Sequence, residues 1–346
     1  MSNCDRSVDR KHFQTLRRAY DRVFGAVNID NDDRYSVLAE MNMNAIITAA
    51  TGYTAADIQI FLWSVAKNCQ NTTVFLIVYD RDRQSIEKLR DKYPFIEPVY
   101  VGASIRKQFA RLANYRTRPF ATWLACQLSK RNYSSMSMPL RLLGQLAMRI
   151  IHERFFIALQ VLKSHPNVFS HVLLTDCRDV IVQTDPFGLM EGKLVSGLET
   201  ELIRDEPYNR QWIEAAYGCA ILDKFLDKTI VCAGVTIGTA DEIENYLTEL
   251  CDEMWRHLPQ MIFQAVGFDQ SAHMYLIFED KIEIDLVNNQ QGSIASLVAE
   301  DPINLSIDLT NGLVKVYEKY PAILHQYDRH PDLLNFFTQL ATEATV

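Results

Sequence analysis

Two acidic residues directly follow a short apolar run near the middle of the chain. The run covers residues 171–175, and Asp176 and Asp179 come next, separated by Cys177 and Arg178. Carboxylates are hard oxygen ligands suited to Mg²⁺ or Mn²⁺, and a tight turn at a strand end could present two of them to one cation. Such a cation would neutralise charge on a departing diphosphate. The alternative is a solvated loop in which Arg178 pairs with either aspartate.

The acidic turn lies within an alternation of apolar runs and helical patterns. Buried strands are predicted at residues 44–50, 73–79, 97–101 and 171–175, and helices at 54–68, 84–92 and 140–163. This alternation is typical of an α/β fold with a mixed, mostly parallel sheet flanked by helices. Ligands bind beyond the carboxyl ends of strands in such sheets, so chemistry is expected just after Ala50 and Thr175.

Length and composition indicate an ordinary globular chain. The 346 residues are predicted to form one main domain at 35–335, with an N-terminal helical extension at 1–34 and a C-terminal tail at 336–346. A hydrophobic content of 48% and a charged content of 23% argue against disorder. The formal net charge is −8 and no long basic run occurs, so nucleic acid is not an expected partner.

Cysteine usage and the hydrophobic pattern bear on location. The seven cysteines are scattered, odd in number and free of any Cys-x-x-Cys pair, which argues against a disulfide framework and against structural zinc. No apolar signal segment opens the chain, and no stretch reaches ~18 uninterrupted apolar residues, so no integral membrane span is expected. A reducing, cytoplasmic location is therefore predicted.

The acidic turn resembles a known family motif. Residues 173–187 resemble the Asp-x-Asp region of glycosyltransferases with the GT-A fold, although two residues rather than one separate the acids here. Residues 229–238 resemble the family's Asn-Ala-Gly strand, with Cys232 in place of the asparagine. Asp269 and Gln270 resemble the Asp-Gln pair of retaining, glycogenin-like members. His325 occupies the place of the late histidine that completes the metal site.

The resemblance implies a Rossmann-like GT-A domain and roles for particular residues. Asp176, Asp179 and His325 would hold Mn²⁺ or Mg²⁺, and Asp269 and Gln270 would lie beside the reacting sugar. Which acid contacts metal directly stays open. Contacts to the nucleotide-sugar donor are implied for Thr48, Ala49, Ala50, Thr51, Tyr53, Asp80, Arg149 and Asp176. Arg149 is taken from an arginine-rich helix that also carries Arg141 and Arg154.

An acidic and aromatic segment at 198–212 is predicted to contact the sugar acceptor. Carbohydrate sites often pair carboxylates with an aromatic face, so Glu199 and Trp212 are assigned there, and Glu199 or Asp269 could serve as a general base. Each of these residues has a plain alternative. Glu199 and Trp212 could be capping and packing residues, Arg149 could pair with Glu153 one turn on, and Asp269 could cap a helix at 270–278.

The function implied is a metal-dependent glycosyltransferase that moves a sugar from a nucleotide-diphosphate sugar, with a UDP-sugar favoured, to a hydroxyl acceptor with retention. One alternative is a sugar-nucleotide nucleotidyltransferase, although residues 51–54 lack the Gly-rich basic loop expected there. A second is a non-catalytic nucleotide-sugar or protein-binding module. A phosphohydrolase with Asp176 as nucleophile is a third, but its D-x-D-x-[TV] pattern is absent.

Overall fold

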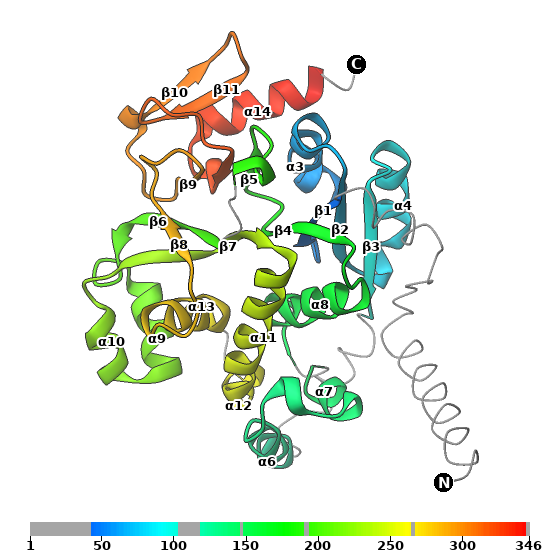
Figure 1. The fold of residues 1–346 in the computed structure, drawn as a ribbon, viewed down its shortest axis with the longest axis vertical. Coiled ribbons are helices and arrows are strands. Elements are labelled where there is room, and N and C mark those ends of the chain that lie inside the picture. The colour runs from blue at the N-terminus through cyan, green and yellow to red at the C-terminus, as the bar shows by residue number, and fades with distance from the viewer. Residues whose placement is uncertain (1–42, 103–117, 146–147, 190–193, 264–266, 344–346) are drawn as a thin grey trace.

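A seven-stranded sheet forms the centre of the computed structural model, which describes residues 43–102, 118–145, 148–189, 194–263 and 267–343 (Figure 1). Its strand order is β3-β2-β1-β4-β7-β6-β8. The strands are β1 (Met43–Ala49), β2 (Thr72–Tyr79), β3 (Ile96–Val101), β4 (Phe169–Thr175), β6 (Val195–Leu202), β7 (Thr229–Thr239) and β8 (Asp285–Val287). Within this sheet only β7 runs antiparallel to its neighbours, which confirms the predicted mixed, mostly parallel sheet. The predicted extension at 1–34 lies outside the described residues.

Helices cover both faces of the sheet, as predicted (Figure 1). Alternation along β1 sends Ile46 to the face covered by α3 (Ala55–Asn68) and α4 (Arg83–Lys92). Ala45 and Ile47 point to the opposite face, covered by α8 (Ile150–Ser164) and α11 (Ala240–Arg256). Burial on both faces is the reason these strands are continuous apolar runs.

Two helix predictions need correction, one for an interruption and one for its first residue. The helix expected at 140–163 is divided into α7 (Met138–Gln145) and α8, and residues 146–147 between them lie outside the described part of the chain. Thr54 precedes α3 as its N-cap, and its side chain forms a reciprocal capping box with Asp57. The cap ends the β1–α3 connection and so fixes where the helix starts.

A smaller sheet joins the end of the chain to the acidic turn. It contains β5 (Val180–Val182), β12 (Ile323–His325) and β9 (Ile294–Ser296), in the order β5-β12-β9. β12 is antiparallel to β5 with His325 opposite Val180, one residue after Asp179. This register alone brings His325 to the acidic turn, although nearly 150 residues separate them in sequence.

The remaining elements complete the layers. A hairpin of β10 (Leu305–Asp308) and β11 (Leu313–Val316) precedes β12, and the other helices are α6 (Arg118–Leu128), α9 (Pro207–Tyr217), α10 (Cys219–Phe225), α12 (Leu258–Phe263), α13 (Phe268–Phe278) and α14 (Pro331–Glu343). The predicted boundary at 335 falls inside α14, which packs on α3 and buries Phe337, so residues 336–343 are not a separate tail. Across the described ranges, no helix is both long and apolar enough to cross a membrane.

Candidate active site

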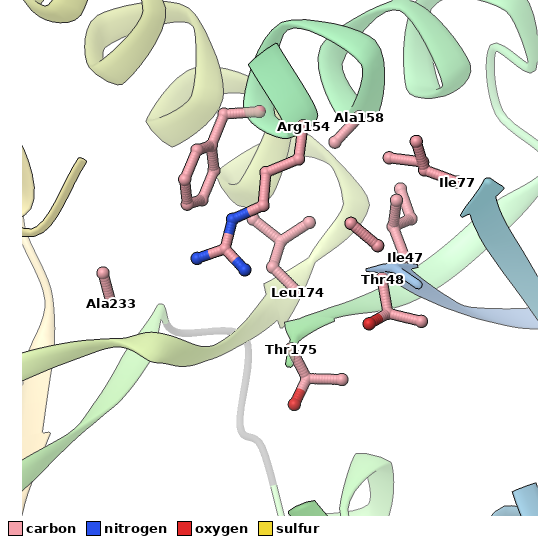
Figure 2. A pocket seen from close by; sticks show the side chains of 10 residues that line it. Ile47, Thr48, Ile77, Arg154, Ala158, Leu174, Thr175 and Ala233 are labelled. Carbon is pink, nitrogen blue, oxygen red and sulfur yellow. The ribbon is translucent and has the colours of Figure 1, made fainter. Parts of the chain in front are cut away.

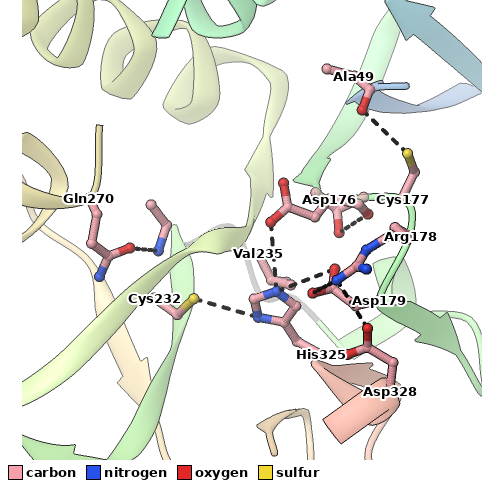
Figure 3. Close-up of polar contacts among 12 residues, drawn as sticks. Ala49, Asp176, Cys177, Arg178, Asp179, Cys232, Val235, Gln270, His325 and Asp328 are labelled. Atoms are coloured by element: carbon pink, nitrogen blue, oxygen red, sulfur yellow. Dashed lines mark hydrogen bonds and ion pairs between the residues drawn. The ribbon is translucent and has the colours of Figure 1, made fainter. Parts of the chain in front are cut away.

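Asp176, Asp179 and His325 form a compact cluster beyond the end of β4 (Figure 3). One ligand atom from each lies within 4.8 Å of the others. His325 Nε2 is 3.7 Å from Asp176 Oδ2 and 3.9 Å from Asp179 Oδ1. Two carboxylates and an imidazole suit Mn²⁺ or Mg²⁺, so the residues fit the divalent cation implied by the resemblance.

Backbone hydrogen bonds fix the acidic turn at both ends. The amide of Asp176 donates to the carbonyl of Gly234 on β7 at 2.9 Å, and the amide of Gln326 donates to the carbonyl of Asp179 at 2.7 Å. Gln326 has a left-handed backbone with φ of 61°, which turns the chain immediately after His325. The turn is thus tied to β7 on one side and to β12 on the other.

Gly234 is required by the close approach of these side chains. A Cβ added there would lie 2.4 Å from His325 Cε1 and 2.9 Å from Asp176 Oδ2. Both separations are shorter than non-bonded atoms tolerate, so any larger residue would displace a candidate ligand. The small-residue strand noted in the sequence therefore has a specific steric reason.

Arg154 on α8 is the basic residue that reaches the acidic turn. Its Nη1 donates to Asp176 Oδ1, and its Nη2 lies 3.4 Å from Asp269 Oδ2, while its Nε is buried and has no hydrogen-bond partner among the described residues. Arg149, the residue predicted from the sequence, is exposed and occupies the N-cap position of α8. The sequence feature that could have identified Arg154 is its place beside Phe155 and Phe156. A charged side chain among apolar neighbours needs a partner of opposite charge.

Arg178, whose pairing with the acidic turn was considered as an alternative, forms an ion pair with Asp179 and a closer one with Asp328. Its Nη2 is 3.0 Å from Asp328 Oδ2 but 4.0 Å from Asp179 Oδ2. The principal partner of Arg178 is therefore Asp328, three residues beyond His325, and this pair adds a further link between the turn and the end of β12. The Asp179 side chain is left facing His325, with 13% of its surface exposed.

The two aspartates of the turn differ in their electrostatics. Burial raises the pKa of Asp176, but the Arg154 guanidinium and the His325 imidazole outweigh burial and lower it below its usual value. The pKa of Asp179 is raised by burial and by the nearby carboxylates of Asp176 and Asp328. Burial opposes the charged form of His325, yet Cys232, Asp176 and Asp179 raise its pKa well above the usual value. A divalent cation would replace the protons that the metal-free cluster retains.

Asp269 and Gln270 lie in the first turn of α13, and Asp269 does not have the capping role considered as an alternative for it. Gly267 is the N-cap residue, and Asp269 is 5% exposed with its carboxylate directed to Arg154. The Gln270 amide bridges the backbone of β7: Nε2 donates to the carbonyl of Val231 at 2.6 Å, and Oε1 accepts from the amide of Ala233 at 2.9 Å. Gln270 thus stabilises the strand that carries Gly234.

Glu199 and Cys232 lie on the other side of His325. Cys232 Sγ is 3.5 Å from His325 Nδ1 (Figure 3), and burial raises the pKa of Cys232, which favours the neutral thiol. Glu199 is half-buried on β6, and burial raises the pKa of its carboxyl to about 7. A carboxyl with a pKa near neutrality can accept or donate a proton at physiological pH.

Trp212 on α9 packs against the start of α13. A Cβ on Gly267 would lie 2.7 Å from Trp212 Cε3, so the indole ring rests directly on the backbone of Gly267, two residues before Asp269. Tyr208, one helical turn earlier, is 63% exposed, with its ring centroid 6.2 Å from that of Trp212. An aromatic face thus extends outward from the N-terminal end of α13.

Most of the residues predicted to contact the nucleotide line one of two cavities beside the cluster. A cleft of about 250 Å³ is lined by Ala49, Thr51, Tyr53, Ile150, Ile151, Arg154, Asp176, Cys177, Arg178 and Asp179. A smaller pocket beneath it includes Thr48, Thr175 and Arg154, which Figure 2 shows around the end of β4. Asp80, in the short 3₁₀ turn after β2, and Arg149 line neither of these cavities.

Comparisons with known proteins give structural similarities only. No family model matches the sequence, and no curated protein is a significant match. Among solved structures, the chain is similar to an active-site mutant of LgtC, with 15% identity, a TM-score of 0.45, and coverage of 86% of this chain and 95% of that one. It is also similar to the galactosyltransferase LgtC in complex with donor and acceptor sugar analogs, with 14% identity, a TM-score of 0.44 and the same coverage. At these TM-scores, the chemistry of the site has to carry the assignment of function.

Proposed function

We propose that this chain is a metal-dependent glycosyltransferase of the GT-A type that uses a nucleotide-diphosphate sugar, preferably a UDP-sugar, and a hydroxyl acceptor. The observation that carries the proposal is the convergence of Asp176, Asp179 and His325 from two distant segments at the carboxyl end of β4. This edge of an α/β sheet is where nucleotide ligands bind. A cleft of about 250 Å³ opens beside the cluster, with the exposed Tyr53 ring at its wall.

The three ligand residues would hold Mn²⁺ or Mg²⁺, which when bound supplies Lewis-acid stabilisation of the leaving diphosphate. Asp176 and Asp179 would each contribute carboxylate oxygen, and His325 would contribute Nε2, the ring nitrogen that faces both acids. The guanidinium of Arg154, which lines the cleft and pairs with Asp176, would place positive charge beside the anionic part of the donor substrate. Thr48, Ala49, Thr51 and Tyr53 would contact the nucleoside, and Asp80 and Arg149 are retained as outer candidates only.

Residues of α13 and β6 would act on the sugar. Asp269 contacts Arg154, which lines the cleft, and we propose that it orients the donor sugar from there. Gln270 would act mainly by keeping β7 in place, with one remaining amide N–H free for the sugar. Glu199, with its pKa raised to about 7, is the candidate for proton exchange with the acceptor hydroxyl. Trp212 would form part of the acceptor side, and retention of configuration is proposed from the Asp-Gln resemblance.

The test is a panel of nucleotide sugars with Mn²⁺, measuring release of nucleotide diphosphate and thermal stabilisation for the intact chain and for Asp179→Ala. We expect turnover with one donor class, dependence on a divalent cation, and loss of at least about 100-fold in activity in the variant. Asp223→Ala serves as the acid control, because this exposed aspartate on α10 lies outside the cation cluster and the cleft beside it. Donor binding without turnover would instead indicate a binding module, and metal-independent turnover would contradict the role given to the acidic turn.

A further inference from the structure

β7 departs from regular pairing at the point where it meets the candidate metal centre. Ser196 of β6 pairs with Thr236 of β7, but Leu198 pairs with Val231. Four residues of β7, 232–235, therefore stand opposite the single residue Gly197 of β6. We call residues 232–235 the β7 bulge. Extra residues in one strand bend it and redirect its backbone, and such features concentrate beside functional sites.

The β7 bulge contains Gly234, whose backbone touches two candidate ligands. The carbonyl of Gly234 accepts the amide of Asp176, and the Cα of Gly234 packs closely against the side chains of Asp176 and His325. A shift of the bulge would therefore move both ligands together. Metal–ligand distances in protein sites agree with standard values to within about 0.2 Å, so the position of the bulge bears directly on whether the cluster fits a cation.

Two side chains replace the ladder hydrogen bonds that the register shift removes. Ser196 Oγ lies 2.9 Å from the carbonyl oxygen of Val235 and 3.2 Å from that of Cys232, so one hydroxyl spans both ends of the bulge. The Gln270 amide bridges Val231 and Ala233 on the other side, and Figure 3 shows its oxygen accepting a hydrogen bond from the backbone. Buried backbone groups need such partners, because an unpaired one costs about as much as a lost hydrogen bond.

Ser196 is itself held by a buried chain of two further side chains. His273 Nε2 on α13 lies 3.4 Å from Ser196 Oγ, and Tyr246 OH on α11 lies 2.7 Å from His273 Nδ1. Ser196 and His273 are fully buried, and Tyr246 is 1% exposed. None of the three belongs to the cation cluster or lines the cleft beside it.

Donor and acceptor roles in this series of three side chains follow from the single hydrogen of the Ser196 hydroxyl. Ser196 uses its single hydrogen on the bulge carbonyls, so its oxygen accepts from His273 Nε2–H. Nδ1 of the neutral ring then accepts from the hydroxyl of Tyr246. Burial lowers the pKa of His273 to about 3, which keeps the ring in this neutral form. In this arrangement His273 and Ser196 each use both of their polar sides, while the buried hydroxyl of Thr236 also lies next to the hydroxyl of Tyr246.

We propose that Ser196, His273 and Tyr246 are positioning residues that hold the β7 bulge in the shape required for cation binding by Asp176, Asp179 and His325. This proposal rests on the proposed function in one respect: both require that the cluster binds a divalent cation. It gives a defined task to three buried polar residues on three separate elements. It also predicts that a hydroxyl on α11, outside the cation cluster, influences the metal through a chain of two hydrogen-bonded side chains.

The test compares Mn²⁺ binding by the full chain with Ser196→Ala and Tyr246→Phe, each of which removes a hydroxyl and little else. The dissociation constant is measured by titration with MnCl₂, following the free Mn²⁺ signal by electron paramagnetic resonance, and the spectrum of the bound ion is recorded. We expect each variant to weaken binding by about 10-fold, as loss of a ligand-orienting partner does, and to alter the bound-ion spectrum. Ser271→Ala is the matched control, because that fully buried hydroxyl donates to the carbonyl of Gly267 at the start of its own helix and, in the described part of the chain, to no residue of β6 or β7.

The double variant Ser196→Ala/Tyr246→Phe separates positioning from general loss of stability. If Tyr246 acts through Ser196, the double variant binds Mn²⁺ as the Ser196→Ala variant does; independent structural damage would give multiplied losses. Unchanged Mn²⁺ affinity in both single variants, multiplied losses, or an equal loss in Ser271→Ala would each overturn the proposal while leaving the proposed function standing. Absence of Mn²⁺ binding by the unsubstituted protein would overturn both.

Discussion

The two halves of the seven-stranded sheet meet at the candidate metal centre and are built differently. From Asn44 onward, β1 keeps a regular parallel register with β2 and β4, and β2 does so with β3, so apolar side chains fill both faces. β7 and β6 lose register twice between Ser196 and Leu202, and polar side chains replace the missing backbone partners. The regular half thus provides a rigid edge for the cleft, whereas the irregular half brings a glycine backbone against two candidate ligands.

This difference separates stability from function within one sheet. The regular half gains from apolar burial, which tolerates volume-conserving changes at modest cost. The irregular half depends on individual hydrogen bonds and on one position without a side chain, so small changes there should disturb the site more than the fold. The predictions below test that contrast, beginning with the largest expected effect.

Gly234→Ala should abolish the site. The added Cβ would overlap His325 Cε1 at 2.4 Å, so we expect Mn²⁺ affinity to fall by about 100-fold and the free energy of unfolding to fall by about 1–3 kcal/mol. Calorimetric titration with MnCl₂ and urea unfolding measure the two quantities. Gly188→Ala is the control, because its added Cβ would meet no atom of the described residues within 4 Å. Normal Mn²⁺ binding by Gly234→Ala would show that the bulge does not constrain the ligands.

Arg154→Met should destabilise the junction of the two halves. It would leave the carboxylates of Asp176 and Asp269 without their shared cation, and because Asp176 is about one-third exposed we expect a loss of about 2–3 kcal/mol in the free energy of unfolding. Arg149→Met tests the residue chosen from the sequence and should change stability by less than about 0.5 kcal/mol. Urea unfolding compares the two variants. Equal losses of stability in the two variants would contradict the assignment of Arg154, rather than Arg149, as the basic residue of the acidic turn.

Mn²⁺ affinity should increase as the pH is raised. The pKa values of Asp179 and His325 are both raised in the metal-free protein, so protons compete with the cation until the pH exceeds those values, whereas Asp176 is already ionised. Binding at neutral pH should therefore release about one proton. Calorimetry in two buffers of different ionisation enthalpy gives the number released. A pH-independent affinity between pH 6 and about 8 would contradict the ligand roles of these two residues.

Much of the regular half could be predicted from the sequence. Continuous apolar runs bounded by polar residues located β1, β2, β3 and β4 to within a residue or two, because burial on both faces requires such runs. The helix predicted at 140–163 is interrupted, because Met148 and Arg149 are not helical although the apolar pattern continues through them. Asp269 looked like an N-cap because capping residues are common before helices, but its carboxylate serves Arg154 instead.

Some residues of the candidate site could be predicted from local sequence patterns, and others could not. Asp176 and Asp179 follow a strand and could be identified locally, and His325 was identified by its place in the order of elements. The choice of Arg149 overlooked the apolar neighbours of Arg154, Phe155 and Phe156, and which side of α8 faces the acidic turn is set by how the helix packs. The chain of Ser196, His273 and Tyr246 carries no local signal, since its members lie on three elements and meet only through packing.

The sequence by itself determined the strand-and-helix alternation, the mostly parallel sheet and the acidic turn at a strand end, because these follow from local periodicity and burial. Tertiary structure decided which histidine and which arginine reach that turn, and where β7 loses register. Those outcomes depend on the pairing of β12 with β5 and on the packing of α8, α11 and α13 around β7. Interactions between residues tens to hundreds of positions apart are set by the packing of whole elements, which local patterns do not encode.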